Sequence, residues 1–312
     1  MGTIAAIAGT LLALGSIPLA AIPLTQHASS AQEAAETDII AARADASQRM
    51  TVPVHIGESG ALRFLIDTGA QNTVLSTALA ARLALPAGRR ARLVGVAGSL
   101  DVDTVHIDEL VLGRRRYYSL LAPLLDAENI GADGILGLDS LQDQRVLLDF
   151  KHNLMAVDDA KSLGGNRDYD IVVTARRRSG QLIVTDAMFD GVRVSVVIDT
   201  GAQTSIGNLA LQRFQRHHRK QEGGMLYSVT GQAIAANYYI GRELQLGRLT
   251  VQNMLVAYAD APAFASLGLA DKPAILLGMR DLRVFDRVAI DFKARTVLFD
   301  LPENARQRSA EF

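Results

Sequence analysis

The sequence contains the hexapeptide Ile-Asp-Thr-Gly-Ala-Gln twice, at residues 66–71 and 198–203. In both copies three apolar residues typical of a buried strand end directly at the aspartate. Burying an aspartate costs free energy unless its carboxylate is hydrogen-bonded or neutralised, so this strand ending is not expected by chance. The repeat therefore raises two linked hypotheses: that a folding unit is duplicated, and that a chemical group is duplicated with it.

Matching landmarks recur in the same order in both halves of the chain. The spacing between the members of a pair grows only from 132 to 142 residues, as insertions in loops permit. The pairs are Asp67 and Asp199, Gly98 and Gly231, Gly113 and Gly247, Gly137 and Gly278, and Asp149 and Asp291. This order indicates an internal repeat of two supersecondary modules.

Both modules have a sequence pattern that is mostly β. Two apolar runs lead into each hexapeptide and flank a turn signal, 57–60 in the first half and Asp190-Gly191 in the second, as in a hairpin. Leucines at helical intervals predict short helices over 76–85 and 208–218. Later β-rich stretches carry central glycines, and a final hairpin closes each module. The sequence predicts a mainly β protein made of two similar modules.

The ends of the 312-residue chain differ from these modules. Residues 4–24 carry no charge and are followed by small residues at 27–32, which predicts that 1–31 form a secretory signal cleaved after Ala31, or a membrane anchor. We therefore expect the protein to be exported. The remaining boundaries predicted are a tether (32–49), a first lobe (50–160), a linker (161–168), a second lobe (169–301) and a tail (302–312).

Composition excludes several kinds of chemistry. The formal net charge of −1 gives no reason to expect nucleic acid as a partner, and the Arg triplets at 114–116 and 176–178 are interpreted as solvated turns. The chain has no cysteine, so thiol catalysis, disulfides and cysteine zinc sites are excluded. His217 and His218 lack a second ligand one helical turn away. Neither a metal nor a cofactor is expected.

The repeated aspartates are the candidate catalytic groups. Thr68 and Thr200 place a hydroxyl beside each carboxylate, and the glycine that follows permits a tight turn whose N–H groups can approach it. If the modules pair about a pseudo-twofold axis, Asp67 and Asp199 meet as like charges that cannot both ionise easily. They then share one proton, so that one carboxyl acts as an acid while the other polarises a water molecule.

The motifs around the two aspartates resemble those of a known protein family. The pattern apolar-Asp-Thr-Gly-Ala, followed by Ile-Leu-Gly at 135–137 or Leu-Leu-Gly at 276–278, resembles the retropepsin-like aspartic proteases. Two copies in one chain resemble bacterial exported members in which fused halves replace a homodimer. The resemblance covers roughly residues 50–300. It implies a bilobal, pseudo-twofold fold of two β-barrel modules with short helices, acting as a single chain in the periplasm, soluble or anchored through residues 4–24.

The resemblance also implies roles for individual residues. Asp67 and Asp199 correspond to the catalytic dyad. The residues that support the two active-site loops are Thr68, Gly69, Ala70, Thr200, Gly201 and Ala202. The stretches 93–102 and 225–234 resemble flap hairpins that close over an extended substrate. The candidate flap residues are Val96, Gly98, Tyr227, Val229 and Gly231.

The function predicted is therefore hydrolysis of peptide bonds in a protein or peptide by water activated between Asp67 and Asp199. One alternative is a catalytically silent peptide-binding or assembly module on the same scaffold. Another is a different hydrolase with paired carboxylates, such as a glycosidase, which needs its carboxyl groups about 5 Å or more apart.

Overall fold

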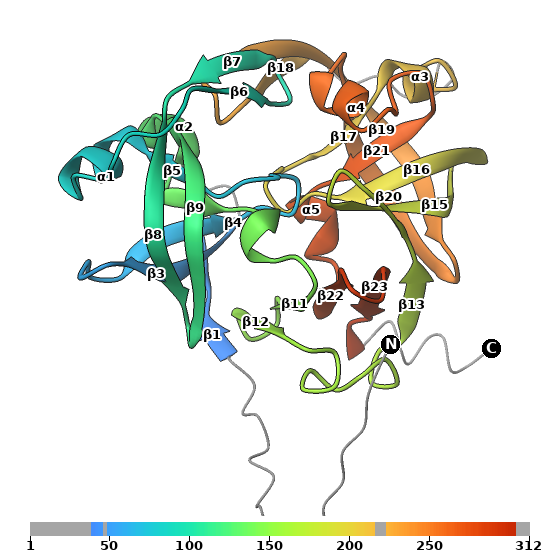
Figure 1. The fold of residues 1–312 in the computed structure, drawn as a ribbon. Helices are drawn as coiled ribbons and strands as arrows, with labels where there is room; N and C mark the ends of the chain where they lie inside the picture. The colour runs from blue at the N-terminus through green and yellow to red at the C-terminus, as the bar shows by residue number, and fades with distance from the viewer. Residues whose placement is uncertain (1–38, 46–48, 216–222, 304–312) are drawn as a thin grey trace, which may run out of the picture. The chain divides into compact units, whose positions relative to one another are not determined.

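Six strands of the first repeat form a closed β-barrel, the core of the first lobe (Figure 1). Pairing of the first strand with the last closes the ring, through His55 with Val111 and Ile56 with Leu110. Around the ring the strands are β3 (Met50–Ile56), β4 (Leu62–Ile66), β10 (Gly134–Leu136), β5 (Val74–Ser76), β9 (Arg115–Leu125) and β8 (Thr104–Leu112). Alternate residues of β3 turn inward, as the period of a strand requires: Val52, Val54 and Ile56 are buried.

The second repeat forms a second six-stranded ring with the same strand order, the core of the second lobe. Its strands are β15 (Gln181–Phe189), β16 (Val192–Ile198), β21 (Ala274–Leu277), β17 (Ser205–Gly207), β20 (Leu249–Tyr258) and β19 (Ala233–Leu246). In both rings the strand before the Asp-Thr-Gly turn pairs in parallel with the strand before the later glycine, β4 with β10 and β16 with β21. The predicted mainly β fold of two repeated modules is confirmed.

Short helices connect the strands. They are α1 (Thr77–Arg82), α2 (Ala127–Ile130), the 3₁₀ turn η1 (Leu138–Ser140), α3 (Leu209–Gln212), α4 (Pro262–Ser266) and α5 (Met279–Leu282). The side chains of Ser76 and Asn208 accept hydrogen bonds from backbone N–H groups in the first turns of α1 and α3, which fixes where these helices begin. Both helices end earlier than the sequence pattern predicted.

A third sheet joins the lobes, because the closing hairpins of the two repeats pair with each other. Its order is β1 (Ile39–Ala41), β12 (Leu154–Asp158), β11 (Arg145–Asp149), β22 (Arg287–Asp291), β23 (Thr296–Asp300) and β13 (Ile171–Thr174). The central pair is β11 with β22, one strand from each half, in antiparallel register. Apolar residues from both strands, among them Val146 and Val288, are fully buried.

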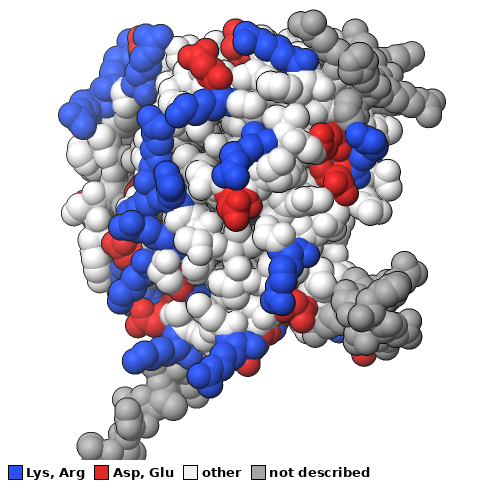
Figure 2. Space-filling model, turned by 90° about the vertical axis from the view of Figure 1, so that its right-hand side faces the viewer, with Lys and Arg blue, Asp and Glu red and all other residues white. Residues whose placement is uncertain are grey.

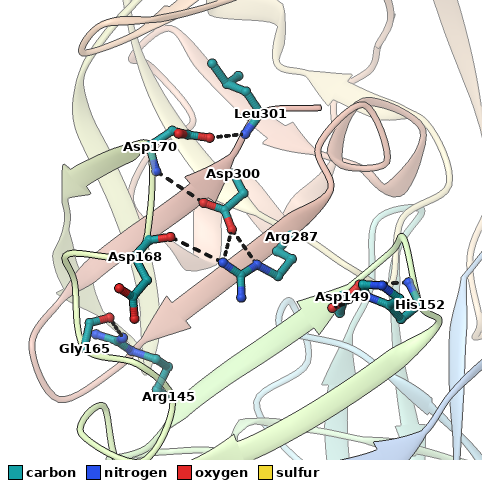
Figure 3. A network of polar contacts seen from close by, with 9 residues as sticks. All are labelled: Arg145, Asp149, His152, Gly165, Asp168, Asp170, Arg287, Asp300 and Leu301. Carbon is teal, nitrogen blue, oxygen red and sulfur yellow. Dashed lines mark hydrogen bonds and ion pairs between the residues drawn. The ribbon is translucent and has the colours of Figure 1, made fainter. Parts of the chain in front are cut away.

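Buried ion pairs fix the polar side chains of this sheet. The Arg145 guanidinium lies 3.0 Å from the Asp291 carboxylate, with the two side chains 0% and 2% exposed. Arg287 binds the fully buried Asp300 and also the backbone carbonyl of Asp168, while Arg145 reaches Gly165 (Figure 3). The predicted linker is therefore tied to the sheet at Gly165 and at Asp168.

The structure, a computed structural model, describes residues 39–45, 49–215 and 223–303, all in the unit Glu36–Phe312. The predicted signal or anchor (1–31) and His217 and His218 lie outside the described residues. Among the residues that are described, no helix is both long and apolar enough to cross a bilayer.

Two expectations about connecting segments need correction. Within the predicted tether, residues 39–41 form β1 on the third sheet, and β2 (Arg43–Ala44) pairs with β3. Burial of Ile40 and Ala42 explains this, because alternate residues of the segment face the protein. The Arg triplet at 176–178 is a strand, β14 (Arg176–Arg178), paired with β15.

We expect Arg145→Ala to lower the free energy of unfolding by about 3–5 kcal/mol, because it leaves Asp291 buried without its cation. Arg177→Ala is the matched control, since its partner Asp143 is exposed and such pairs contribute about 1 kcal/mol or less. Urea denaturation of both variants measures the difference. Equal losses in the two variants would contradict the assignment of the Arg145 pair as a determinant of stability.

Candidate active site

Both repeated aspartates begin a turn at the end of a buried strand. The Asp67 N–H donates to the Leu136 carbonyl at 3.1 Å, and the Asp199 N–H donates to the Leu277 carbonyl at 3.0 Å. Each aspartate is thus anchored to the parallel neighbour of its own strand. The repeated sequence therefore produces a repeated backbone position for the carboxylate.

The turn after each aspartate supplies hydrogen bonds to its carboxylate, as the glycine predicted. Oδ1 of Asp67 accepts from the N–H groups of Gly69 at 2.7 Å and Ala70 at 3.0 Å. Oδ1 of Asp199 accepts from the N–H groups of Gly201 and Ala202, both at 3.1 Å. These bonds offset part of the cost of burying each carboxylate.

The two threonines connect the turns across the junction of the lobes. Thr68 Oγ1 donates to the carbonyl of Ile198 at 2.8 Å, and Thr200 Oγ1 donates to the carbonyl of Ile66 at 2.8 Å. Each hydroxyl also accepts the backbone N–H of the other threonine, at 3.0 and 3.3 Å. Both threonines are buried, so the four bonds fix the relative position of the two aspartate turns.

The carboxylates lie close together around the turn glycines. A Cβ atom placed on Gly69 would lie 2.8 Å from Asp199 Oδ1 and 3.0 Å from Asp67 Oδ1. Both distances start from one point, so these two oxygens are at most their sum apart, about 5.8 Å. A Cβ on Gly201 would lie 2.3 Å from Asp67 Oδ2. Each glycine therefore leaves the space that the carboxylate of the opposite lobe occupies.

Burial and the second carboxylate shift the protonation of this pair. Burial raises the pKa of Asp199, and the charge of Asp67 adds to this effect, so that the pKa reaches about 7. Burial also raises the pKa of Asp67, while hydrogen bonds from Gly69 and Ala70 and the positive charge of Arg49 act in the opposite direction. The two carboxyls are therefore inequivalent. The positive charge of Arg49 favours the ionised form of Asp67.

Two hairpins lie over the junction of the lobes (Figure 1), and their tips are in contact, because Gly95 lies against Ser228. The first, flap one, is β6 (Ala91–Val94) and β7 (Ser99–Val102); the second, flap two, is β18 (Gly224–Tyr227) and the start of β19. Val96 at the tip of flap one packs on the apolar cluster of the second lobe that Ala202 also joins. Val229 at the tip of flap two packs on the first-lobe cluster that Ala70 joins.

The remaining candidate flap residues have different surroundings. Gly98 lies against Gln232 of flap two, and Gly231, with φ of +78°, lies against Asn129 of α2. The Tyr227 side chain is 78% exposed, on the side of β18 opposite to Leu226.

Sequence reasoning missed the residues that brace the turns from behind. Thr73 Oγ1 donates to Asp139 at 2.7 Å and accepts the Gly137 N–H, and Ser205 Oγ plays the same part between Asp281 and Gly278. These aspartates follow Gly137 by two residues and Gly278 by three, so the repeat does not align them. The two hydroxyl residues are aligned by the repeat, six residues after Asp67 and Asp199, but the partners that they bind are visible only in the structure.

It also missed a matched pair of residues beside the dyad. Gln181, in the second lobe, donates to the carbonyl of Gly69 in the first. Arg49, 132 residues earlier, binds Asp45 at 2.8 Å and the Ile130 carbonyl at 2.9 Å. Arg49 directly precedes β3 and Gln181 is the first residue of β15, and neither carried a motif signal.

The fold and site together define a class. Two closed barrels that each present one aspartate at their common junction form a bilobal, retropepsin-like architecture. The sequence model of the aspartyl protease family matches the chain twice, over residues 52–140 and 185–280, which together exceed half of its length. The chain belongs to the aspartyl protease family, with one retropepsin-like unit in each half. No curated protein matches it. Within the described parts of the chain, no three His, Asp or Glu side chains are grouped to hold a metal ion.

The raised pKa of Asp199 predicts a pH-dependent stability. An unfolded aspartate loses its proton near pH 4, whereas folded Asp199 keeps it to about pH 7, so stability falls as pH rises between these values. Asp199→Asn removes this pH-dependent loss of stability, and its side-chain oxygen can still accept the N–H groups of Gly201 and Ala202. We expect the variant to exceed the wild type in free energy of unfolding by up to about 4 kcal/mol at pH 8, and by little at pH 4.

Urea denaturation across this pH range measures the effect, with the exposed Asp101→Asn as control. The control should follow the wild-type pH dependence. An Asp199→Asn variant with the same pH slope as the wild type would show that Asp199 ionises normally in the folded protein.

Proposed function

We propose that the protein is an aspartic endopeptidase that hydrolyses peptide bonds with a water molecule activated between Asp67 and Asp199. The observation that carries the proposal is the pair of carboxylates held by mirrored turns at the lobe junction, close enough for each to affect the other's ionisation. Like-charged carboxylates that share a proton supply an acid and a base at one place. Membership of the aspartyl protease family supports the same reaction.

The inequivalence of the pair gives each carboxyl a role. Asp67, favoured as the anion by Arg49, takes a proton from water as the water oxygen bonds to the peptide carbonyl carbon. Asp199, which keeps its proton to about pH 7, gives it to the carbonyl oxygen, so a neutral tetrahedral intermediate forms. Proton transfer from Asp67 to the peptide nitrogen then breaks the C–N bond, and return of a proton to Asp199 from the intermediate restores the pair.

The flaps constrain the substrate. Their tips meet, with Gly95 lying against Ser228, so we infer that they separate to admit a polypeptide and close over it. Hairpins with free backbone groups favour an extended peptide, which can add main-chain hydrogen bonds to a strand. Both halves of the machinery lie in one chain, so we expect a single chain to be sufficient for activity.

Asp67→Asn and Asp199→Asn test the proposal. Each replaces one carboxyl by a group that can neither take nor give the proton, so we expect cleavage of unfolded casein to fall by at least about 10³-fold in both variants. Mass spectrometry of the fragments measures cleavage, and circular dichroism checks the fold. The exposed Asp108→Asn, in β8 and outside the flaps, should remain active. Full activity in either dyad variant would exclude this mechanism.

The same assay separates the alternative functions. A silent peptide-binding or assembly module would bind unfolded casein without releasing fragments, and the dyad variants would bind as the wild type does. A peptide in which a tetrahedral hydroxyl replaces the scissile carbonyl should inhibit the endopeptidase far more strongly than the matching substrate binds. A glycosidase would show neither response.

The assignment of the base to Asp67 predicts a role for Arg49. Arg49→Gln, which places the residue of the matching position in the second half, removes the cation that favours Asp67 as an anion. We expect the acid limb of the pH profile of kcat/KM to move to higher pH, because the pair then loses its first proton less readily. Arg49→Lys, which keeps the positive charge, should return the acid limb to its wild-type pH. A changed KM with an unmoved acid limb would assign Arg49 to structure or substrate contact only.

A further inference from the structure

The second lobe carries a hollow of about 390 Å³ on the outside of its barrel. It lies between the edge strand β14, the adjacent strands β15 and β16, and the residues that lead into β21. Its walls are formed by Arg176, Thr185, Arg193, Val194, Ser195, Lys272 and Pro273. The volume falls at the lower end of the range of small-ligand sites, about 300–1,000 Å³.

The hollow is cationic and has no internal counter-charge. Arg176, Arg193 and Lys272 are exposed, and within the described residues none of the three forms an ion pair. Thr185 and Ser195 add hydroxyl groups. Figure 2, which views the side of the second lobe, shows Lys and Arg gathered along one edge of this face. Three cations around one hollow repel one another, and a bound anion relieves that repulsion.

The first lobe shows what the same position looks like when it is filled. Strand registers match Ser195 with Arg63 and Ala274 with Asp133, because Val196 pairs with Ile275 as Phe64 pairs with Gly134. In the first lobe the Asp133 carboxylate accepts the backbone N–H of Arg63 at 2.7 Å. The Arg63 side chain crosses this position to bind the Gly131 carbonyl at 2.9 Å.

The second lobe lacks both of these groups. Serine replaces the arginine that fills the position, and alanine replaces the carboxylate. Lys272 stands where the first lobe has Gly131, and Arg193 stands where it has Ala61. The repeat thus provides an internal comparison: one copy is closed and carries its own carboxylate, and the other is open and cationic.

We propose that this hollow, bounded by Arg176, Arg193, Lys272 and Ser195, binds the phosphate group of a small molecule or a lipid. Arginine donates paired N–H groups that fit two phosphate oxygens, lysine adds a point charge, and the hydroxyls donate to the remaining oxygen. Pro273 provides an apolar wall for the group that carries the phosphate. The site is separate from the aspartate pair and does not depend on the proposed hydrolysis.

Thermal unfolding of the full chain with inorganic phosphate tests the site. Phosphate should raise the midpoint more than sodium chloride of equal ionic strength, and this excess should shrink in the Arg193→Ala, Lys272→Ala variant, because stabilisation by exclusion of phosphate from the surface acts on both proteins alike. Calorimetry then gives its Kd. Arg193→Ala with Lys272→Ala should weaken binding by about tenfold or more.

Two further variants make this result specific. Arg242→Ala with Arg248→Ala removes two exposed cations of the same lobe outside the hollow and should leave the Kd unchanged. Ser195→Asp places a carboxylate among the three cations and should abolish phosphate binding, with circular dichroism as the check that the variant is folded.

Vesicles distinguish the two sources of phosphate. Sedimentation compares phosphatidic acid vesicles with phosphatidylcholine vesicles, for the wild type and for the Arg193→Ala, Lys272→Ala variant. A variant-sensitive preference for phosphatidic acid identifies a lipid headgroup, and binding of inorganic phosphate alone identifies a soluble ligand. No phosphate effect beyond that of chloride together with no variant-sensitive vesicle binding would overturn the proposal, as would equal weakening by the two double substitutions.

Discussion

The crossed hydrogen bonds between the Thr68 and Thr200 turns are the interaction on which the site depends. Each hydroxyl donates to a carbonyl of the opposite lobe and accepts the opposite threonine N–H, so the turns cannot shift separately without breaking buried bonds. Broken buried bonds are costly, because water does not replace the lost partner. Two carboxylates that would otherwise repel are thereby held together in a buried place; burial raises the pKa of both, and the charge of Asp67 raises that of Asp199 further.

The rest of the structure supports this junction from two sides. Below it, the shared sheet pairs β11 of one half with β22 of the other, and the buried Arg145–Asp291 pair fixes the register of these strands. Above it, the flap tips exchange apolar contacts, Val96 with the second lobe and Val229 with the first. Both devices use one element from each half, so each ties the two repeats together.

The sequence predicted the architecture of each half and, through the repeat, that the two halves pair, but it did not predict the contacts that other segments make between the halves. The hexapeptides, the later glycines and the apolar hairpins are local signals, and they predicted the modules, the turns and the N–H groups around each carboxylate. The crossing of Gln181 to Gly69 and the seating of residues 39–44 on two sheets depend on which surfaces meet. The charge of a triplet such as Arg176–Arg178 likewise does not reveal that it forms a strand.

Differences between the halves carry information that their similarity does not. The two halves share the features that a carboxylate pair requires: the strand that ends at the aspartate, the turn after it, and the threonine in that turn. Beside them, the second half has glutamine at the position that matches Arg49. A duplicated chain can in this way make its two carboxyls inequivalent, whereas identical subunits must keep them equivalent. On the outer wall, Arg63 and Asp133 of the first lobe give way to Ser195 and Ala274 in the second. Positions freed from the symmetry of the dyad are therefore where this chain can acquire chemistry of its own.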